Sequence, residues 1–171
     1  MTELWLLEDL EPFPHPPVAG DVFSPTTFWL DASSEVCESP VPTEICTRVT
    51  ARVEPRLHGD HTEWVAEFDG GFQTMLRGDH RPGIVELHGC LFWDRYSQLD
   101  FLTEPRGSVH LLSRSCLVQR RRLMPTRYPH WFTPHYSGPL RLVNAAAVPD
   151  DHDVRLRALR VQTDLATPPD L

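Results

Sequence analysis

The sequence predicts an all-β, mainly antiparallel protein. Apolar and polar residues alternate with a period of two from Ile45 onward, which is typical of half-buried strands. Turn-forming residues separate these runs, and Asp69-Gly70-Gly71 is a strong hairpin signal. Three strands, a short helix and further strands follow one another in a pattern typical of an OB-like barrel. We therefore expect a small β-barrel, with the OB type preferred over a sandwich or an up-and-down barrel.

Each element is expected where the alternation is clearest. Strands are predicted at residues 45–54, 64–68, 72–77, 84–94, 109–120, 140–148 and 154–165. Gly89 lies in the middle of the fourth run, where glycine often marks a bulge or a tight bend. The last run changes phase at Leu159, which indicates a bulge. Residues 94–102 break the alternation and are predicted to form the one short helix.

Residues 1–44 differ from the rest and are predicted to form an acidic, Pro-rich N-terminal arm. They contain seven prolines and nine acidic residues but no arginine. The prolines at 12–17 exclude a continuing helix, so at most a turn or two is expected over Leu4–Leu10. Five aromatic residues would anchor this arm, which packs on or docks from a β domain spanning 45–171.

Composition limits the classes of protein that fit. The formal charge of the 171 residues is -8, too acidic overall for a protein that coats a nucleic acid. All 16 basic residues are arginine, which reflects GC-rich coding and suggests a bacterial source. The four cysteines form no CxxC pair and are expected to be reduced thiols. A secretory signal and a long apolar stretch are both absent, which predicts a cytoplasmic protein without a membrane partner.

Residues 105–149 carry seven arginines and no acidic residue, and aromatic residues cluster in the expected loop 124–138. Guanidinium groups beside flat rings suit an anionic ligand, a nucleotide, a nucleic acid or an acidic protein segment. The predicted ligand-binding residues are Arg114, Arg120, Arg121, Arg122, Arg127, Tyr128, His130, Trp131, Phe132 and Tyr136. The leading hypothesis is thus a non-enzymatic binding or accessory protein. Alternatively, these arginines neutralise the N-terminal arm of the same molecule or of a second copy.

A small barrel enzyme is the alternative function, with an interior pocket of His, Tyr and Glu. Its candidate catalytic residues are Glu86, His88 and His135, although surface positions on a one-sided sheet are the favoured explanation for the alternation of Glu86 and His88. Common hydrolase, metalloprotease and nucleotide-binding motifs are absent. No cofactor or metal is expected, because the histidines beside Gly59 and Gly78 suit exposed turns.

A second alternative is an acidic inhibitor or immunity-type protein that covers a basic partner. Trp5, Leu6, Leu7 and Leu10 would then form an acidic-hydrophobic docking segment for a protein partner or for self-association. The competing interpretation is that these residues pack against the molecule's own barrel.

Overall fold

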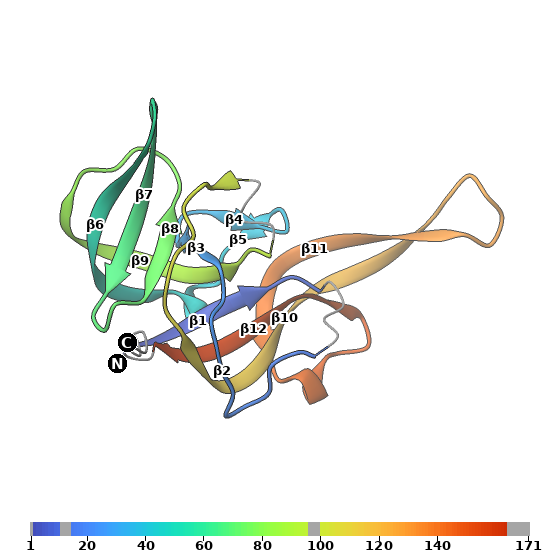
Figure 1. Ribbon diagram of the computed structural model, residues 1–171. Coiled ribbons are helices and arrows are strands. Elements are labelled where there is room, and N and C mark those ends of the chain that lie inside the picture. Colours follow the sequence, from blue (N-terminus) through green and yellow to red (C-terminus); the bar gives the residue numbers. More distant parts are fainter. Residues whose placement is uncertain (1, 11–14, 96–99, 164–171) are drawn as a thin grey trace.

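The protein is all-β, as a computed structural model of residues 2–10, 15–95 and 100–163 shows (Figure 1). This confirms the predicted fold class. Four of the nine residues of the short helix expected at 94–102, residues 96–99, lie outside the described residues. None of the helical turns in the described part of the chain is long and apolar enough to cross a membrane.

The elements follow one another in short steps along the chain. In the N-terminal region they are β1 (Glu3–Glu8), β2 (Val22–Phe23), β3 (Thr27–Asp31), β4 (Glu35–Val36), β5 (Ser39–Pro40) and the 3-10 turn η1 (Thr43–Ile45). They continue with β6 (Thr47–His58), β7 (His61–Phe68), β8 (Gln73–Leu76), β9 (Gly83–Trp93), β10 (Val109–Pro125), β11 (Phe132–Val143), the 3-10 turn η2 (Ala145–Ala147) and β12 (His152–Thr163).

Five strands close into a small barrel. The ring runs β6-β7-β8-β3-β9 and returns to β6, and β3–β8 is its one parallel pairing. The strands β6, β7 and β8 form a meander, with Gly70 and Gly71 at positive φ in the predicted turn between β7 and β8. The small-barrel prediction is therefore confirmed, whereas the OB topology stays a prediction.

An outer sheet continues from the barrel. Strand β1 pairs in parallel with the end of β9 and antiparallel with β12, after which β10 and β11 follow. The barrel and the outer sheet are thus one continuous sheet, with β11 at one end (Figure 1).

Gly89 is the point at which β9 changes partners. It is opposite Thr47 of β6 and also opposite Asp31 of β3. A Cβ atom at this position would lie 2.1 Å from the Leu30 carbonyl oxygen, so only glycine permits the approach. The predicted tight bend at Gly89 therefore corresponds to the junction between the barrel strands.

Two buried clusters hold the sheet together. The first joins apolar side chains from all five barrel strands to β1, β10 and β12, and includes Phe68, Phe72 and Leu91. The second lies on other faces of the same strands and includes Ile45 and Met75. Because β12 supplies Leu159 to the first and Ala158 to the second, it is covered on both faces there.

The bulge predicted at Leu159 is wrong, because β12 is regular there and buried on both faces. The phase change arises because adjacent residues enter different clusters. The bulges in the β10–β12 pairing lie elsewhere, where Leu112 and Arg155 have no opposite residue.

The N-terminal arm contributes strands to the main sheet. Residues 3–8 form β1 and not the helical turn considered for Leu4–Leu10, since Leu4, Leu6 and Leu7 are buried from both faces. The strand β3 is itself part of the barrel. The boundary expected at residue 44 therefore does not coincide with a break in the sheet.

A buried carboxylate ends β1. Glu8 has no exposed side-chain surface, and it forms ion pairs with Arg95 and Arg157, which come from the end of β9 and from β12. The Glu8 carboxylate thus connects the segment that follows β9 to strand β12 of the outer sheet. Replacing one member of such a group leaves the other charges buried without compensation.

We expect Glu8→Ala to reduce the free energy of unfolding by about 3 kcal/mol, the usual cost of breaking a buried ion pair. Urea denaturation at pH 7 measures this change. The control is Glu3→Ala, which removes an exposed pair with Arg160 and should cost less than about 1 kcal/mol. Equal losses in the two variants would contradict a special role for Glu8.

We expect Gly89→Ala to separate β9 from β3 and to lower the midpoint of thermal unfolding by about 6–12 °C, as a loss of roughly 3 kcal/mol implies in a domain of this size. Circular dichroism during heating measures the midpoint. Gly59→Asn is the control, because its added Cβ meets no atom within 4 Å and asparagine tolerates the left-handed backbone. A normal midpoint for Gly89→Ala would refute the assigned steric role.

Candidate functional site

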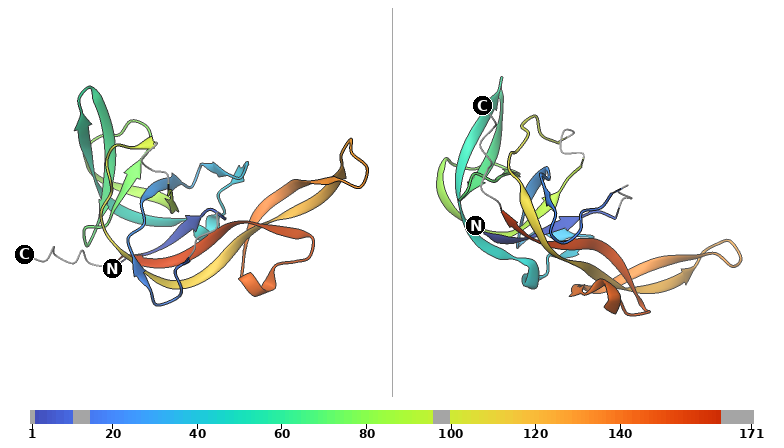
Figure 2. Two further views of the ribbon diagram at one scale, coloured as in Figure 1. Left: turned by 45° about the vertical axis from the view of Figure 1, so that its right-hand side comes forward. Right: turned by 60° about the horizontal axis from the view of Figure 1, so that its bottom comes forward.

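A two-stranded ribbon projects from the body of the protein (Figures 1 and 2). Strand β12 pairs with β10 only as far as Arg120, opposite His152. Beyond that point β10 and β11 pair with each other, and we call residues 121–136 the ribbon. At about 3.4 Å per residue it extends about 20 Å to its tip. The aromatic loop predicted at 124–138 is thus largely strand, and β11 begins eight residues before the predicted strand at 140.

The tip of the ribbon is ordered by its own backbone. Thr126 donates its N–H to the Trp131 carbonyl at 2.9 Å, and Trp131 donates to the Tyr128 carbonyl at 3.2 Å. His130 has a φ of 65°, a left-handed conformation that is uncommon outside glycine. These contacts define a tight turn that presents the aromatic residues without an underlying core.

Cross-strand pairing gives the ribbon two different faces. Residues that alternate along each strand point the same way, so opposite pairs share a face. The apolar face contains Leu123, Pro125, Phe132, Pro134 and Tyr136, with Arg121 opposite Tyr136 at its base. The polar face contains Arg122, Met124, Thr133 and His135. Leu123, Phe132 and the tip residue Trp131 are 54%, 59% and 71% exposed, so the apolar face is uncovered in this chain.

The ribbon edges are poorly suited to strand addition. Pro134 and Pro139 lie on β11, where each lacks an N–H donor. Proline and charged residues at a sheet edge oppose pairing with another strand. Binding at the ribbon is therefore expected to involve its side chains.

Acidic residues from the start of β12 neutralise the base of the ribbon. Arg121 pairs with Asp153 at 2.7 Å, and Tyr136 donates its hydroxyl to the same carboxylate at 2.9 Å. Arg120 lies 3.6 Å from Asp151. The sequence does not predict this role, because the pairing of these acidic residues with the ribbon arginines arises only in the tertiary structure. These arginines are thus paired, but not with the N-terminal arm.

A second set of contacts fixes the angle of the ribbon. The Arg155 guanidinium lies 3.7 Å from the Tyr136 ring centroid and donates to Gln119 at 2.5 Å. Gln119 in turn donates to the hydroxyl of Ser39 in β5 at 2.9 Å. Burial, and then the hydrogen bond to Asp153, raise the pKa of Tyr136, so its hydroxyl remains a donor at neutral pH.

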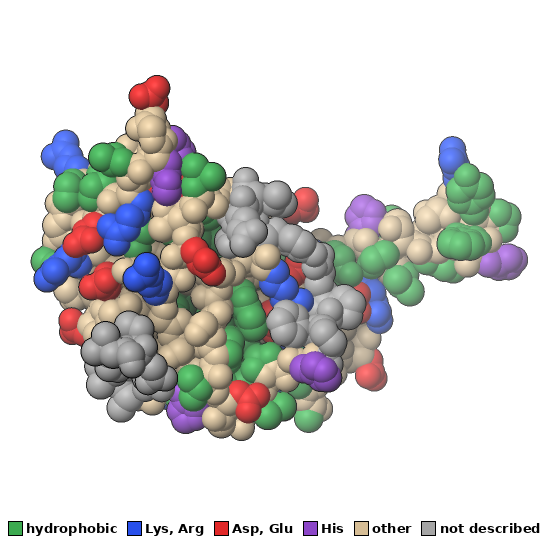
Figure 3. Space-filling model, in the orientation of Figure 1, with side chains coloured by type: hydrophobic (Ala, Val, Ile, Leu, Met, Phe, Trp, Pro, Cys, Tyr) green, Lys and Arg blue, Asp and Glu red, His purple; other side chains and the backbone are tan. Residues whose placement is uncertain are grey.

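Two of the predicted ligand-binding arginines have guanidinium groups that no carboxylate neutralises in the described part of the chain. Within the described residues, neither Arg122 nor Arg127 forms an ion pair with a carboxylate. Arg127 donates to the hydroxyl of Tyr128 at 2.8 Å and lies 4.8 Å from its ring centroid. Figure 3 shows the ribbon as a projection of apolar, basic and histidine side chains.

Arg114 does not belong to this surface. It lies within β10 beside β12 and donates to the backbone carbonyl of Pro17 at 2.9 Å. This contact joins Arg114 to the N-terminal arm, but its acceptor is a backbone carbonyl and not one of the acidic side chains of the arm. The predicted ligand-binding set therefore divides into a projecting group and residues that hold the fold together.

The candidate catalytic residues do not meet. Glu86 is exposed and pairs with Arg48 at 2.9 Å, whereas His88 lies farther along β9. His135 is on the polar face of the ribbon, away from the barrel. The buried cluster shared by the barrel strands is apolar. This arrangement offers no common pocket for Glu86, His88 and His135.

The predicted docking segment is mostly occupied by the molecule itself. Leu6 and Leu7 are completely buried in opposite clusters, and Trp5 packs at the edge of the second. Leu10 is 38% exposed. The competing interpretation, that these residues pack on the chain's own sheet, agrees with their positions.

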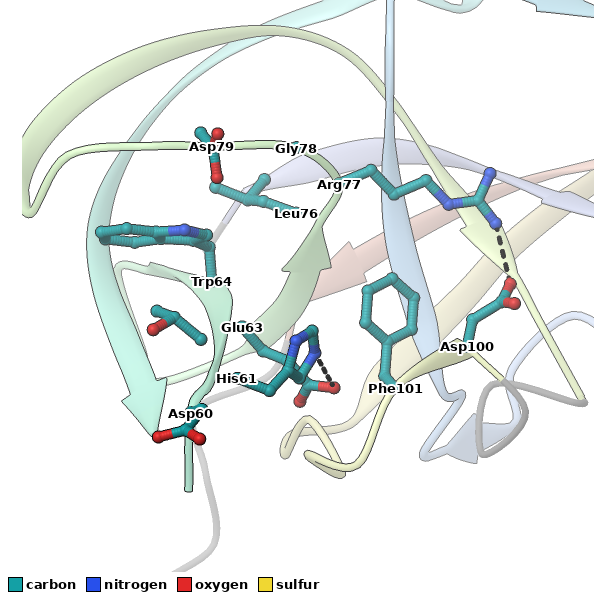
Figure 4. Close-up of a pocket in the computed structure, with 11 residues that line it drawn as sticks. Asp60, His61, Glu63, Trp64, Leu76, Arg77, Gly78, Asp79, Asp100 and Phe101 are labelled. Carbon is teal, nitrogen blue, oxygen red and sulfur yellow. Dashed lines mark hydrogen bonds and ion pairs between the residues drawn. The ribbon is translucent and has the colours of Figure 1, made fainter. Parts of the chain in front are cut away.

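A pocket of about 550 Å³ is lined by residues of β7, of the end of β8 and the turn after it, and of the segment 100–101 (Figure 4). Asp60, Asp79 and Asp100 lie around it, and Trp64 and Phe101 supply aromatic surface. We call this the acidic pocket. Arg77 is its one arginine and is paired with Asp100 at 3.1 Å.

Glu63 forms the floor of the acidic pocket. Its carboxylate accepts the backbone N–H groups of Leu102 at 2.6 Å and Thr103 at 2.8 Å, and His58 and His61 lie within 3.5 Å. Burial raises the pKa of Glu63, but the hydrogen bonds from Thr103 and Leu102 and the neighbouring His58 outweigh burial and lower the pKa below its ordinary value. The ionised carboxylate therefore ties the 100–103 segment to β7.

The described residues contain no cluster suited to hold a metal ion, and all four cysteines are free thiols. No family model matches the sequence, and neither a curated protein nor a solved structure is detectably similar. The site therefore has to be interpreted from its own geometry.

We expect the stabilising effect of Glu63 to disappear at low pH. A carboxyl whose pKa is lower when folded stabilises the fold above its unfolded pKa, and this contribution is lost as the pH falls through the folded value. Glu63→Gln should therefore cost about 1–3 kcal/mol at pH 7 and little at pH 3. Urea denaturation across this range provides the measurement, with exposed Asp60→Asn as the control. A penalty that is independent of pH would contradict the assignment.

Proposed function

We propose that the protein is a non-enzymatic binding protein whose ribbon docks onto an acidic, partly apolar surface of a protein partner. The observation that supports this most strongly is the uncovered apolar face, with Leu123, Phe132 and Trp131 each more than half exposed. An isolated two-stranded hairpin is only marginally stable in water. Exposed apolar surface on such an element is typical of an interaction site.

The residue types at the tip favour a protein partner. Trp, Tyr and Arg are the residues most enriched among those that dominate binding energy, and the tip presents Trp131, Tyr128 and Arg127 together. Because Arg122 and Arg127 have no acidic partner in the described residues, the complementary surface should carry carboxylates.

Nucleic acid is a less suitable partner. Its affinity comes mainly from many simultaneous phosphate contacts, whereas Arg120 and Arg121 are already neutralised by aspartates. Outside residues 105–149 the chain has 24 acidic residues and nine arginines, so its body repels a polyanion. Stacking of bases on Trp131 would give a single-stranded nucleic acid another way to bind, and a titration with oligo-dT measures such binding directly.

The test uses two labelled probes, a random copolymer of Glu and Tyr and an oligo-dT single strand, in fluorescence anisotropy titrations of the full chain. We expect binding to the copolymer and an affinity about 30-fold lower in Trp131→Ala, which corresponds to a loss of about 2 kcal/mol. Arg127→Glu should weaken binding and reduce its salt dependence.

The matched control is Leu57→Ala, since Leu57 is 74% exposed but lies on β6 outside the ribbon. Its affinity should equal that of the unmodified protein. Binding of oligo-dT alone, lost in Trp131→Ala, would replace the proposed partner with a nucleic acid. Binding of the copolymer that is unaffected by the ribbon substitutions would refute the proposal.

A further inference from the structure

Opposite charges are segregated within one chain. Residues 105–149, which include the ribbon, carry seven arginines and no acidic residue. The acidic pocket carries Asp60 and Asp79, neither of which forms an ion pair in the described residues. The chain therefore contains a cationic aromatic projection and also an anionic aromatic recess.

The ribbon of one molecule does not lie near its own acidic pocket. In Figure 1 the ribbon extends to one side, while β7 and β8, whose residues line the pocket, lie on the other side. Further views of the ribbon diagram agree that it points away from the barrel (Figure 2). Any contact between these two features must therefore join different molecules.

We infer that a second copy of this chain is the acidic partner, with the ribbon tip of one molecule docked in the acidic pocket of the next. This inference rests on the proposed function of the ribbon. It assigns Arg127 to the carboxylates of Asp60 and Asp79, and Trp131 to the aromatic surface of Trp64. A pocket of about 550 Å³ is large enough to receive side chains of this size.

The simplest alternative contact between copies leaves the charges of the ribbon unmatched. Packing the apolar faces of two ribbons against each other would keep Arg122, on the polar face, outside the contact and would give the tip residue Arg127 no carboxylate. No acidic residue lies between 105 and 149 to supply one. Contact between a ribbon and a pocket is heterologous, because it joins two different surfaces, and it therefore generates rings or open filaments.

The test combines two variants that each disable one side of the contact. Trp131→Ala with Arg127→Glu disables the ribbon, and Asp60→Arg with Asp79→Arg disables the pocket. Sedimentation velocity of the unmodified chain should show species larger than a monomer, growing with concentration. Each variant alone should remain monomeric, because each lacks one of the two surfaces.

An equimolar mixture of the two variants gives the decisive result. One still has an intact pocket and the other an intact ribbon, so the mixture should form a heterodimer of twice the monomer mass that grows no further. Arg81→Glu and Asp69→Arg are the controls, because both residues are exposed in turns and neither lines the pocket. Both control variants should assemble like the unmodified chain.

Three results would overturn the inference. They are a monomeric unmodified chain, a mixture that stays monomeric, and assembly that persists in the pocket variant. If the unmodified chain is monomeric yet binds the Glu-Tyr copolymer through Trp131, the proposed function stands and the partner is a different protein. If neither assembly nor copolymer binding requires Trp131, both the inference and the proposed function fail.

Discussion

The close approach of β9 to β3 at Gly89 is the constraint around which the molecule is arranged. Because no side chain separates Gly89 from the Leu30 carbonyl, β9 can pair with β6 along its first half and with β3 and β1 along its second. The first pairing closes the barrel, and the last one begins the outer sheet. The ribbon continues that outer sheet, so its position follows from the same junction.

Ion pairs perform two different tasks in this acidic chain. At the junction, Glu8 compensates Arg95 and Arg157 in a buried position, where losing any one charge is costly. At the ribbon base, Asp153 pairs with Arg121 and receives the Tyr136 hydroxyl while both remain partly exposed. The first set stabilises the fold, and the second orients an element that has no core of its own. Beyond these contacts, Arg122 and Arg127 form no ion pair with a carboxylate among the described residues.

Local pattern predicted much of the fold but not the pairing between distant segments. The period of two identified β6, β7, β9 and β10, because each has one buried and one more exposed face over most of its length. It failed at β1 and at Leu159, where both faces are buried and alternation disappears. The sequence predicts a loop where the ribbon lies, because Pro134 and polar residues obscure its alternation, and only the pairing of β11 with β10 reveals the apolar face. Arg114 and Arg127 look equivalent in the sequence, and only the tertiary structure separates a residue held by Pro17 from one at an exposed tip.

The ribbon combines properties that conflict in an isolated monomer. Its tip is held in one conformation by backbone hydrogen bonds, and its base by Gln119 and Asp153, which limits the entropy lost on binding. Yet its apolar face contacts water, which opposes the ordered state. An ordered element with an uncovered apolar face is stabilised when a partner removes that face from water, and the prolines on β11 direct the partner to the face and away from the edge. The same features that make the ribbon unfavourable alone therefore make it suitable for docking.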